Sequence, residues 1–273
     1  MEIRILDKDG NRLRFLLKGV ETPVANALRR IMIAEVPSMV IDDVVIIENS
    51  SVMKDELLAH RLGLLPLKTD LDSYVFPEDC TCKSELGCNK CSVSLTLEAE
   101  ATGSTRTVYS GELKSDNPDV IPVNDNVPLL KLTGDQKVRL EAYARLGRGI
   151  THAKWQPVSA CTYKYEPAIQ INSRKCNGCE DCVKSCVKQV LKMDGKKAAI
   201  GDYTQCNLCK ECVTACPSEA IQVSPVEDSF IFNVESVGGL PPERIFLEAA
   251  KILNEKTEDF ITQVSSFKED DAE

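Results

Sequence analysis

The fold is decided by residues 21–67, which read ETPVANALRRIMIAEVPSMVIDDVVIIENSSVMKDELLAHRLGLLPL. Thr22 and Pro23 are typical of a helix start, with Thr22 as the N-cap, and Pro37 is typical of a helix end. Between them, apolar residues recur at helical spacing, namely Val24, Leu28 and Ile31. Residues 39–48 then have strand character, so this stretch predicts a helix followed by a strand.

The elements predicted around this stretch are a mixture of strands and helices. Residues 2–18 alternate like a β-hairpin around a turn, and a short helix is expected around Met53 to Arg61. From Ser92 to about Tyr165 the pattern is β-rich, and Phe230–Phe232 indicates a further strand. This order predicts an α+β fold class with more than one domain.

A long helix is expected at the C-terminal end, from Pro241-Pro242 to about Phe267. Its apolar residues repeat every seven positions, namely Phe246, Leu253, Phe260 and Phe267, with Ala249, Ile252 and Val264 beside them. A seven-residue stripe of this length favours packing along another helix, and burial on the chain's own sheet is the alternative.

The composition narrows the classes of function. The chain has 273 residues and a formal net charge of −9, which argues against a dedicated nucleic-acid-binding subunit, and no direct sequence-specific DNA binding is expected. No apolar run approaches the roughly 20 residues of a membrane span, and the charged N-terminus lacks a signal peptide's apolar core. A cytoplasmic location is therefore expected, where clustered cysteines remain reduced and act as metal ligands. No nucleotide-binding or nucleophile motif occurs, so no catalytic residue is predicted.

Eight of the 13 cysteines form two copies of the spacing C-x2-C-x2-C-x3-C, which ferredoxin-like proteins use to hold 4Fe-4S clusters. In a two-cluster arrangement, three cysteines of one run share a cluster with the fourth cysteine of the other. The first predicted set is Cys176, Cys179, Cys182 and Cys216. The second predicted set is Cys206, Cys209, Cys212 and Cys186. Zinc-type sites and free thiols are the alternatives, and this register makes zinc a poor competitor.

The sequence beyond the ligands repeats as well, because QVLKM follows Cys186 and EAIQV follows Cys216. This indicates a duplicated loop–helix–strand unit over residues 167–223. The two copies differ after the last cysteine, where Val187 stands in the first copy and Pro217 in the second. Because all eight ligands are present, two clusters are expected.

A further cysteine group has the spacing C-x-C-x5-C-x2-C and consists of Cys80, Cys82, Cys88 and Cys91. Four thiolates within twelve residues can close a tetrahedral zinc site. Such a site has no open position, so its role would be structural. The alternative is four reduced cysteines without metal.

Two stretches, NSSVMKDELLAHRLGLLPL at 49–67 and HAKWQPVSA at 152–160, carry a resemblance to a known family. Together with residues 21–48 and the C-terminal helix, they resemble the D-type subunits of archaeal RNA polymerase. The relatives of that family are the third-largest subunit of the eukaryotic enzymes and the amino-terminal domain of the bacterial alpha subunit. A ferredoxin-like insert in some members corresponds to the cysteine runs, and a zinc-binding loop of the eukaryotic relatives corresponds to the Cys80 group.

The resemblance implies a noncatalytic assembly subunit of DNA-directed RNA polymerase, which as a complex is a nucleotidyltransferase. It implies a heterodimer with a small L-type subunit, joined by the N- and P-type subunits and by the large catalytic subunits. Arg29 and Arg30 would face the large subunits, and two solvated arginines on a helix surface are the alternative. The implied organisation is a discontinuous dimerisation domain (1–47 and 224–267), a β-rich domain (48–166), the cysteine-rich domain (167–223) and an acidic tail (268–273). The cysteine runs taken alone favour another function, an electron-carrying iron–sulfur subunit of an oxidoreductase.

Overall fold

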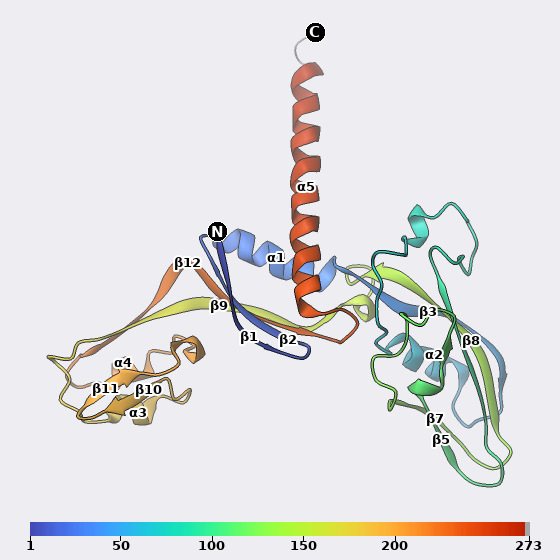
Figure 1. Cartoon of the computed structure of the whole chain (residues 1–273), viewed down its shortest axis with the longest axis horizontal. Helices are drawn as coiled ribbons and strands as arrows, with labels where there is room; N and C mark the ends of the chain where they lie inside the picture. The colour runs from blue at the N-terminus through green and yellow to red at the C-terminus, as the bar shows by residue number, and fades with distance from the viewer. Residues whose placement is uncertain (271–273) are drawn as a thin grey trace. The chain divides into compact units, whose positions relative to one another are not determined.

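The structure, a computed structural model, describes residues 1–270 and the side chains of residues 1–266 (Figure 1). Its α-helices are α1 (Thr22–Ala34), α2 (Asp55–Gly63), α3 (Asp181–Ser185), α4 (Glu211–Thr214) and α5 (Pro242–Asp270). Its strands are β1 (Glu2–Asp9), β2 (Arg12–Lys18), β3 (Pro37–Asn49), β4 (Val93–Glu100), β5 (Arg106–Tyr109), β6 (Lys114–Ser115), β7 (Pro128–Leu132), β8 (Lys137–Arg148), β9 (Val158–Ile171), β10 (Leu191–Asp194), β11 (Lys197–Ile200) and β12 (Ile221–Ser236). The chain is thus a mixed helix-and-strand fold.

The chain divides into two compact units. The first contains Met1–Asp9, Leu13–Asn26 and Thr162–Asn233, and the second contains the remaining residues. Each unit is therefore assembled from segments that are far apart in the sequence.

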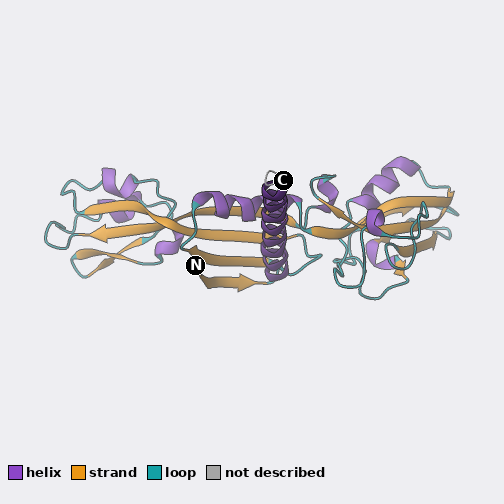
Figure 2. Ribbon diagram, turned by 90° about the horizontal axis from the view of Figure 1, so that it is seen from above, coloured by secondary structure: helices purple, strands orange, loops and turns teal. Residues whose placement is uncertain are grey.

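A four-stranded sheet with the order β1–β2–β12–β9 brings the N-terminal hairpin beside the last strand of the chain (Figure 2). Phe15 of β2 stacks on Phe232 of β12, with ring centroids 5.1 Å apart and planes 4° apart. Tyr163 of β9 meets Phe230 edge-on at 5.4 Å. The expected hairpin is confirmed, and its second strand, β2, pairs with β12.

Strand β12 is longer than the sequence indicates. It runs for 16 residues, although Pro225 and the left-handed backbone of Asp228 (φ 53°) interrupt its regular pattern. Its first residues, Ile221 and Val223, pack among buried cysteines of the cysteine-rich segment. One strand therefore belongs both to that segment and to the four-stranded sheet.

The second unit has its core between a sheet of order β3–β8–β4–β6 and helix α2. β3 and β8 pair antiparallel from Pro37 opposite Arg148 to Asn49 opposite Val138, with bulges after Ile41 and Ile46. Leu58 and Leu62 of α2 are fully buried in this core, and β5 pairs with β7. The prediction of a β-rich region after Ser92 is confirmed.

Helix α1 buries a slightly different face from the one predicted. Leu28 and Ile31 are buried as expected, but Val24 is 40% exposed. Ala25 and Met32 complete the buried stripe instead. The helix starts at Thr22 itself, whose hydroxyl lies 3.0 Å from the Tyr165 hydroxyl, so Thr22 is not the residue before the helix. Val24 sits in this first turn, at the edge of the buried face.

Helix α5 begins at Pro242 and reaches Asp270, three residues beyond its expected end (Figure 1). Arg244 anchors its first turn through ion pairs with Asp72 at 2.7 Å and Glu248 at 2.9 Å. Lys256 lies 2.5 Å from the Glu35 carboxylate. In the described part of the chain, no helix is long and apolar enough to cross a membrane.

Candidate metal centres and partner helix

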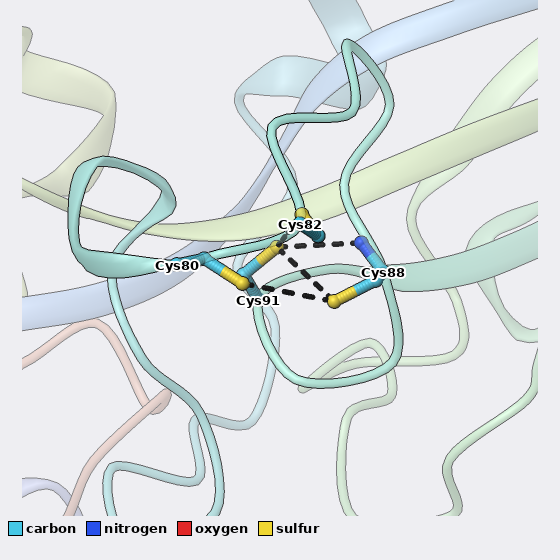
Figure 3. Close-up of side chains that lie close together, drawn as sticks. All are labelled: Cys80, Cys82, Cys88 and Cys91. Carbon is cyan, nitrogen blue, oxygen red and sulfur yellow. Dashed lines mark hydrogen bonds between the residues drawn. The ribbon is translucent and has the colours of Figure 1, made fainter.

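The four cysteines of the Cys80 group lie on one loop between β3 and β4, and their sulfurs converge (Figure 3). All four sulfurs lie within 4.8 Å of one another, as required of a group that could hold one metal ion. The sulfur–sulfur distances are 3.7 Å for Cys80–Cys88, 3.8 Å for Cys82–Cys91 and 3.9 Å for Cys88–Cys91. The structure thus brings the whole predicted group together.

The loop's backbone makes this convergence possible. Gly87 has φ 84°, and an added Cβ would lie 2.6 Å from the Ser92 Cβ, so only glycine fits there. The amide of Cys88 donates to the Cys91 sulfur at 3.3 Å (Figure 3). Such amide–sulfur bonds stabilise a thiolate, which is the form that binds metal.

Cys88 and Cys91 do not lose their protons equally. A hydrogen bond from the Lys90 backbone lowers the pKa of Cys88 to about 7. Burial raises the pKa of Cys91 to about 12. The Cys88 thiol therefore loses its proton more readily than the Cys91 thiol, which a bound cation would help to ionise.

Each of the two cysteine runs passes into a short helix, α3 or α4 (Figure 1). The residues before these helices, Glu180 and Lys210, both have left-handed backbones, with φ 65° and 63°. This turn repeats the sequence duplication in three dimensions. β10 and β11 form a hairpin between the copies, and α3 packs against α4.

Three cysteines of the first predicted set act electrostatically on the fourth, Cys182. Burial raises the pKa of Cys182, followed by the negative charges of Cys216, Cys179 and Cys176. These three are the partners that the crossed arrangement assigns to Cys182, and Cys216 comes from the other run.

The second predicted set surrounds a cavity of about 220 Å³ with a largely apolar lining. All four of its cysteines line the cavity, namely Cys186, Cys206, Cys209 and Cys212. Burial raises the pKa of Cys212 to about 11, followed by the charges of Cys186, Cys206 and Cys209. Four thiols around an apolar cavity fit a cluster better than they fit water, because water needs polar partners.

Backbone amides point at the sulfurs of both sets in matching ways. The amide of Val190 donates to the Cys186 sulfur at 3.4 Å, and that of Ala220 donates to the Cys216 sulfur at 3.3 Å. Both donors lie four residues after the cysteine. Bonds of this kind orient cluster ligands and stabilise their negative charge.

Two side chains that contact the segment around the second set could not be predicted from the sequence. Lys164 of β9 donates its ammonium group to the Cys206 carbonyl at 2.6 Å. Arg14 of β2 donates to the Thr204 carbonyl at 2.5 Å and to its hydroxyl at 3.0 Å. These residues lie on strands distant in sequence, so only the fold reveals their contacts with the cysteine run.

The apolar stripe of α5 is buried at one end and exposed at the other. Ile245 and Ala249 are fully buried, whereas Phe260 is 65% and Ile261 57% exposed. Val264 is 40% exposed, and the side chain of Phe267 lies outside the described residues. The far half of α5 therefore presents large apolar side chains to solvent, as a helix does before it meets a partner.

Comparison with known proteins agrees with these features. Residues 14–257 match the model of the RNA polymerase Rpb3/Rpb11 dimerisation domain. The chain is 45% identical to DNA-directed RNA polymerase subunit Rpo3 of Archaeoglobus fulgidus, over 94% of this chain and 96% of that protein. It is 41% identical to the Rpo3 of Methanosphaera stadtmanae, over 97% and 99%, and 38% identical to that of Pyrococcus furiosus, over 97% of each. The chain therefore belongs to the Rpo3 family of DNA-directed RNA polymerase subunits, which is built on the Rpb3/Rpb11 dimerisation domain.

Proposed function

We propose that this chain is the noncatalytic assembly subunit of a DNA-directed RNA polymerase and pairs through α5 with a smaller, L-type subunit. The observation that carries this proposal is the exposed apolar face of α5 around Phe260 and Ile261, in a chain whose residues 14–257 match a dimerisation domain. The heterodimer then supports the two large catalytic subunits and the N- and P-type subunits in the cytoplasm. The electron-carrying alternative finds no support among the relatives, which are polymerase subunits.

The proposed domain organisation follows from this role. Residues 1–47 and 224–267 provide the dimerisation domain, and residues 48–166 provide the β-rich domain with the Cys80 group. Residues 167–223 provide the cysteine-rich domain. The pairing of β2 with β12 supports a discontinuous dimerisation domain, because it joins Arg12–Lys18 to Ile221–Ser236.

Two 4Fe-4S clusters are proposed for the cysteine-rich domain. The electrostatic effect of Cys216 on Cys182 and the 220 Å³ cavity within the second set support the crossed arrangement. Clusters held in this way would mainly stabilise the domain, because its buried core is small and includes three of the cysteines. Iron analysis of anaerobically purified protein tests this part, and four rather than eight irons per chain would remove one cluster.

A structural zinc ion is proposed for the Cys80 group. A tetrahedral zinc with Zn–S bonds of about 2.3 Å has sulfur–sulfur edges of about 3.8 Å. Three of the six sulfur–sulfur distances, 3.7–3.9 Å, match that edge, and all six are within 4.8 Å. The ion would cross-link the loop and carry no chemistry of its own.

Substitution on α5 tests the proposed pairing. Phe260→Glu places a charge on the exposed apolar face, and we expect at least about 100-fold weaker binding of the small subunit, because a buried aromatic anchor is lost. Lys251→Glu is the matched control, since it lies nine residues away, about two and a half turns, on the opposite side of the helix. Titration calorimetry with the small subunit provides the measurement. Equal affinity of Phe260→Glu and the wild type would refute pairing through this face.

A further inference from the structure

The segment Tyr203–Cys206, which leads into the second cysteine run, is held by side chains of β2 and β9. Lys164 reaches the Cys206 carbonyl at 2.6 Å, and Arg14 makes two hydrogen bonds to Thr204, at 2.5 and 3.0 Å. The Lys164 bond is partly buried. The main chain of a predicted cluster ligand is thus fixed by a cation that belongs to the four-stranded sheet.

These cations also gather in one place. Arg14, Lys164 and Lys188 line a cavity of about 380 Å³ together with Asn207, the residue after Cys206. Among the described residues that line it there is no carboxylate. Like charges repel at short range, so this arrangement is favourable only where negative charge lies close by. Asp202 supplies part of that charge, because it interacts electrostatically with both Lys164 and Arg14. Four thiolates around the adjacent 220 Å³ cavity, which Cys206 and Asn207 also line, would supply more.

We propose that Lys164, assisted by Arg14, is a positioning and charge-compensating residue for the second cluster site, the one formed by Cys186, Cys206, Cys209 and Cys212. This inference rests on the proposed cluster binding. Lys164 fixes the main chain of Cys206 and places a positive charge beside it. Reduction by one electron adds negative charge to the site, so a neighbouring fixed cation favours the reduced form and raises the reduction potential.

At the first cluster site, Cys216, the ligand that comes from the other cysteine run, lies beside a neutral group. The Cys216 sulfur lies 3.5 Å from the Ser218 hydroxyl, which is a neutral group. Removing the Lys164 charge should therefore change the reduction potential of the second cluster and leave the reduction potential of the first cluster unchanged. This selectivity separates the proposal from a general loss of stability.

The experiment is an anaerobic titration of the full chain with dithionite, followed by electron paramagnetic resonance, together with iron analysis. For Lys164→Met we expect the oxidised-to-reduced ratio of one cluster at a fixed potential to rise at least tenfold, about 59 mV for one electron. Lys164→Arg should restore the wild-type potential because it keeps the charge. Lys197→Met is the matched control, because Lys197 also donates to a carbonyl, that of Ser173 at 2.7 Å, but is exposed.

The affected cluster is identified in a second background. Cys206→Ser with Cys212→Ser removes the second site, and adding Lys164→Met there should leave the remaining potential unchanged. Loss of four irons from Lys164→Met alone, restored by Lys164→Arg, would also support the positioning role. Eight irons with both potentials unchanged in Lys164→Met would overturn the inference. Absence of iron from the wild-type chain would instead overturn cluster binding itself, and this inference with it.

Discussion

At the scale of single residues, Glu166 is a buried carboxylate of the first unit that contacts three other side chains. It lies on β9, is buried, and accepts hydrogen bonds from Ser229 at 2.7 Å and Tyr203 at 3.2 Å. Lys18 of β2 forms an ion pair with it at 3.0 Å. Glu166 therefore ties β2, β9 and β12 to the segment that precedes the second cysteine run.

This carboxylate predicts a pH-dependent stability. Burial alone would raise the pKa of Glu166, but hydrogen bonds from Ser229 and Lys18 outweigh burial and lower it. A lowered folded-state pKa stabilises fully above the unfolded value of about 4.3, and the effect is lost as the pH falls through the folded value. Glu166→Gln should cost roughly 1–3 kcal/mol at pH 7, and the cost should shrink below about pH 4.

Urea unfolding of the wild type and of Glu166→Gln, at pH 7 and at pH 3.5, measures this difference in the free energy of unfolding. Glu227→Gln is the control, because Glu227 is an exposed carboxylate on the same strand as Ser229. A cost that is the same at both pH values would show that the charge of Glu166 contributes nothing.

The Cys80 group predicts a second pH effect. The pKa of Cys91 is raised to about 12 by burial, so binding a metal ion must displace its proton near neutral pH. Zinc affinity should therefore increase from pH 6.5 to pH 8, and binding should release protons. Competition with a chelator at the two pH values, combined with Cys88→Ser as a variant that lacks one ligand, provides the test. An affinity independent of pH would contradict binding by four thiolates.

At the scale of secondary-structure elements, strand β8 and the short segment around Trp155 depend on each other. The Trp155 indole donates to the Arg145 carbonyl at 3.3 Å, and the Trp155 carbonyl accepts from Ser38 at 2.8 Å. Lys154 lies over the indole ring, 4.3 Å from its centroid. A Cβ added to Gly147 would overlap the indole ring. Glycine is therefore required on β8 where the indole crosses it.

Gly147→Ala should destabilise the second unit by roughly 2 kcal/mol or more, because the overlap can be relieved only by moving a buried aromatic ring. Thermal unfolding of the full chain provides the measurement. Gly103→Ala is a poor control because its φ is 74°, whereas Gly63→Ala meets nothing closer than 3.6 Å. Equal losses for Gly147→Ala and Gly63→Ala would show that the indole contact does not matter.

The elements also show what the sequence could predict. The hairpin and the long C-terminal helix were predictable because alternation and helical spacing are local patterns. The Cys80 group was predictable from its spacing, and its four sulfurs do converge. The continuity of β12 was not, since Pro225 is a typical strand breaker and the strand survives through tertiary pairing. Likewise, nothing local distinguishes Gly147 or Lys164, whose roles come from contacts with distant segments.

At the scale of the whole molecule, strands β9 and β12 contribute both to the core of the cysteine-rich segment and to the four-stranded sheet. The buried core of the segment includes Ile221 and Val223 of β12, with Ile169 and Ile171 of β9 packed against it. The same two strands continue into the four-stranded sheet, in which β12 pairs with β2 on one side and with β9 on the other. Loss of the proposed clusters would thus disturb two strands of that sheet.

We therefore predict a defect in assembly when one cluster is removed. Cys206→Ser with Cys209→Ser should leave α5 and its pairing with the small subunit intact, but should lower the recovery of whole polymerase. Quantitative purification of heterodimer and of whole polymerase from the same cells separates these two steps. Unchanged assembly and transcription would falsify a regulatory role for the clusters.

The measurement that tests the central claim most directly is anaerobic purification of the chain at its native level, followed by identification of the proteins that elute with it. The assembly role predicts one equivalent of a small subunit and both large polymerase subunits. Phe260→Glu in the same experiment should lose all of them, because the small subunit no longer pairs with α5. A wild-type chain that elutes alone, with neither a small partner nor the large subunits, would contradict the role.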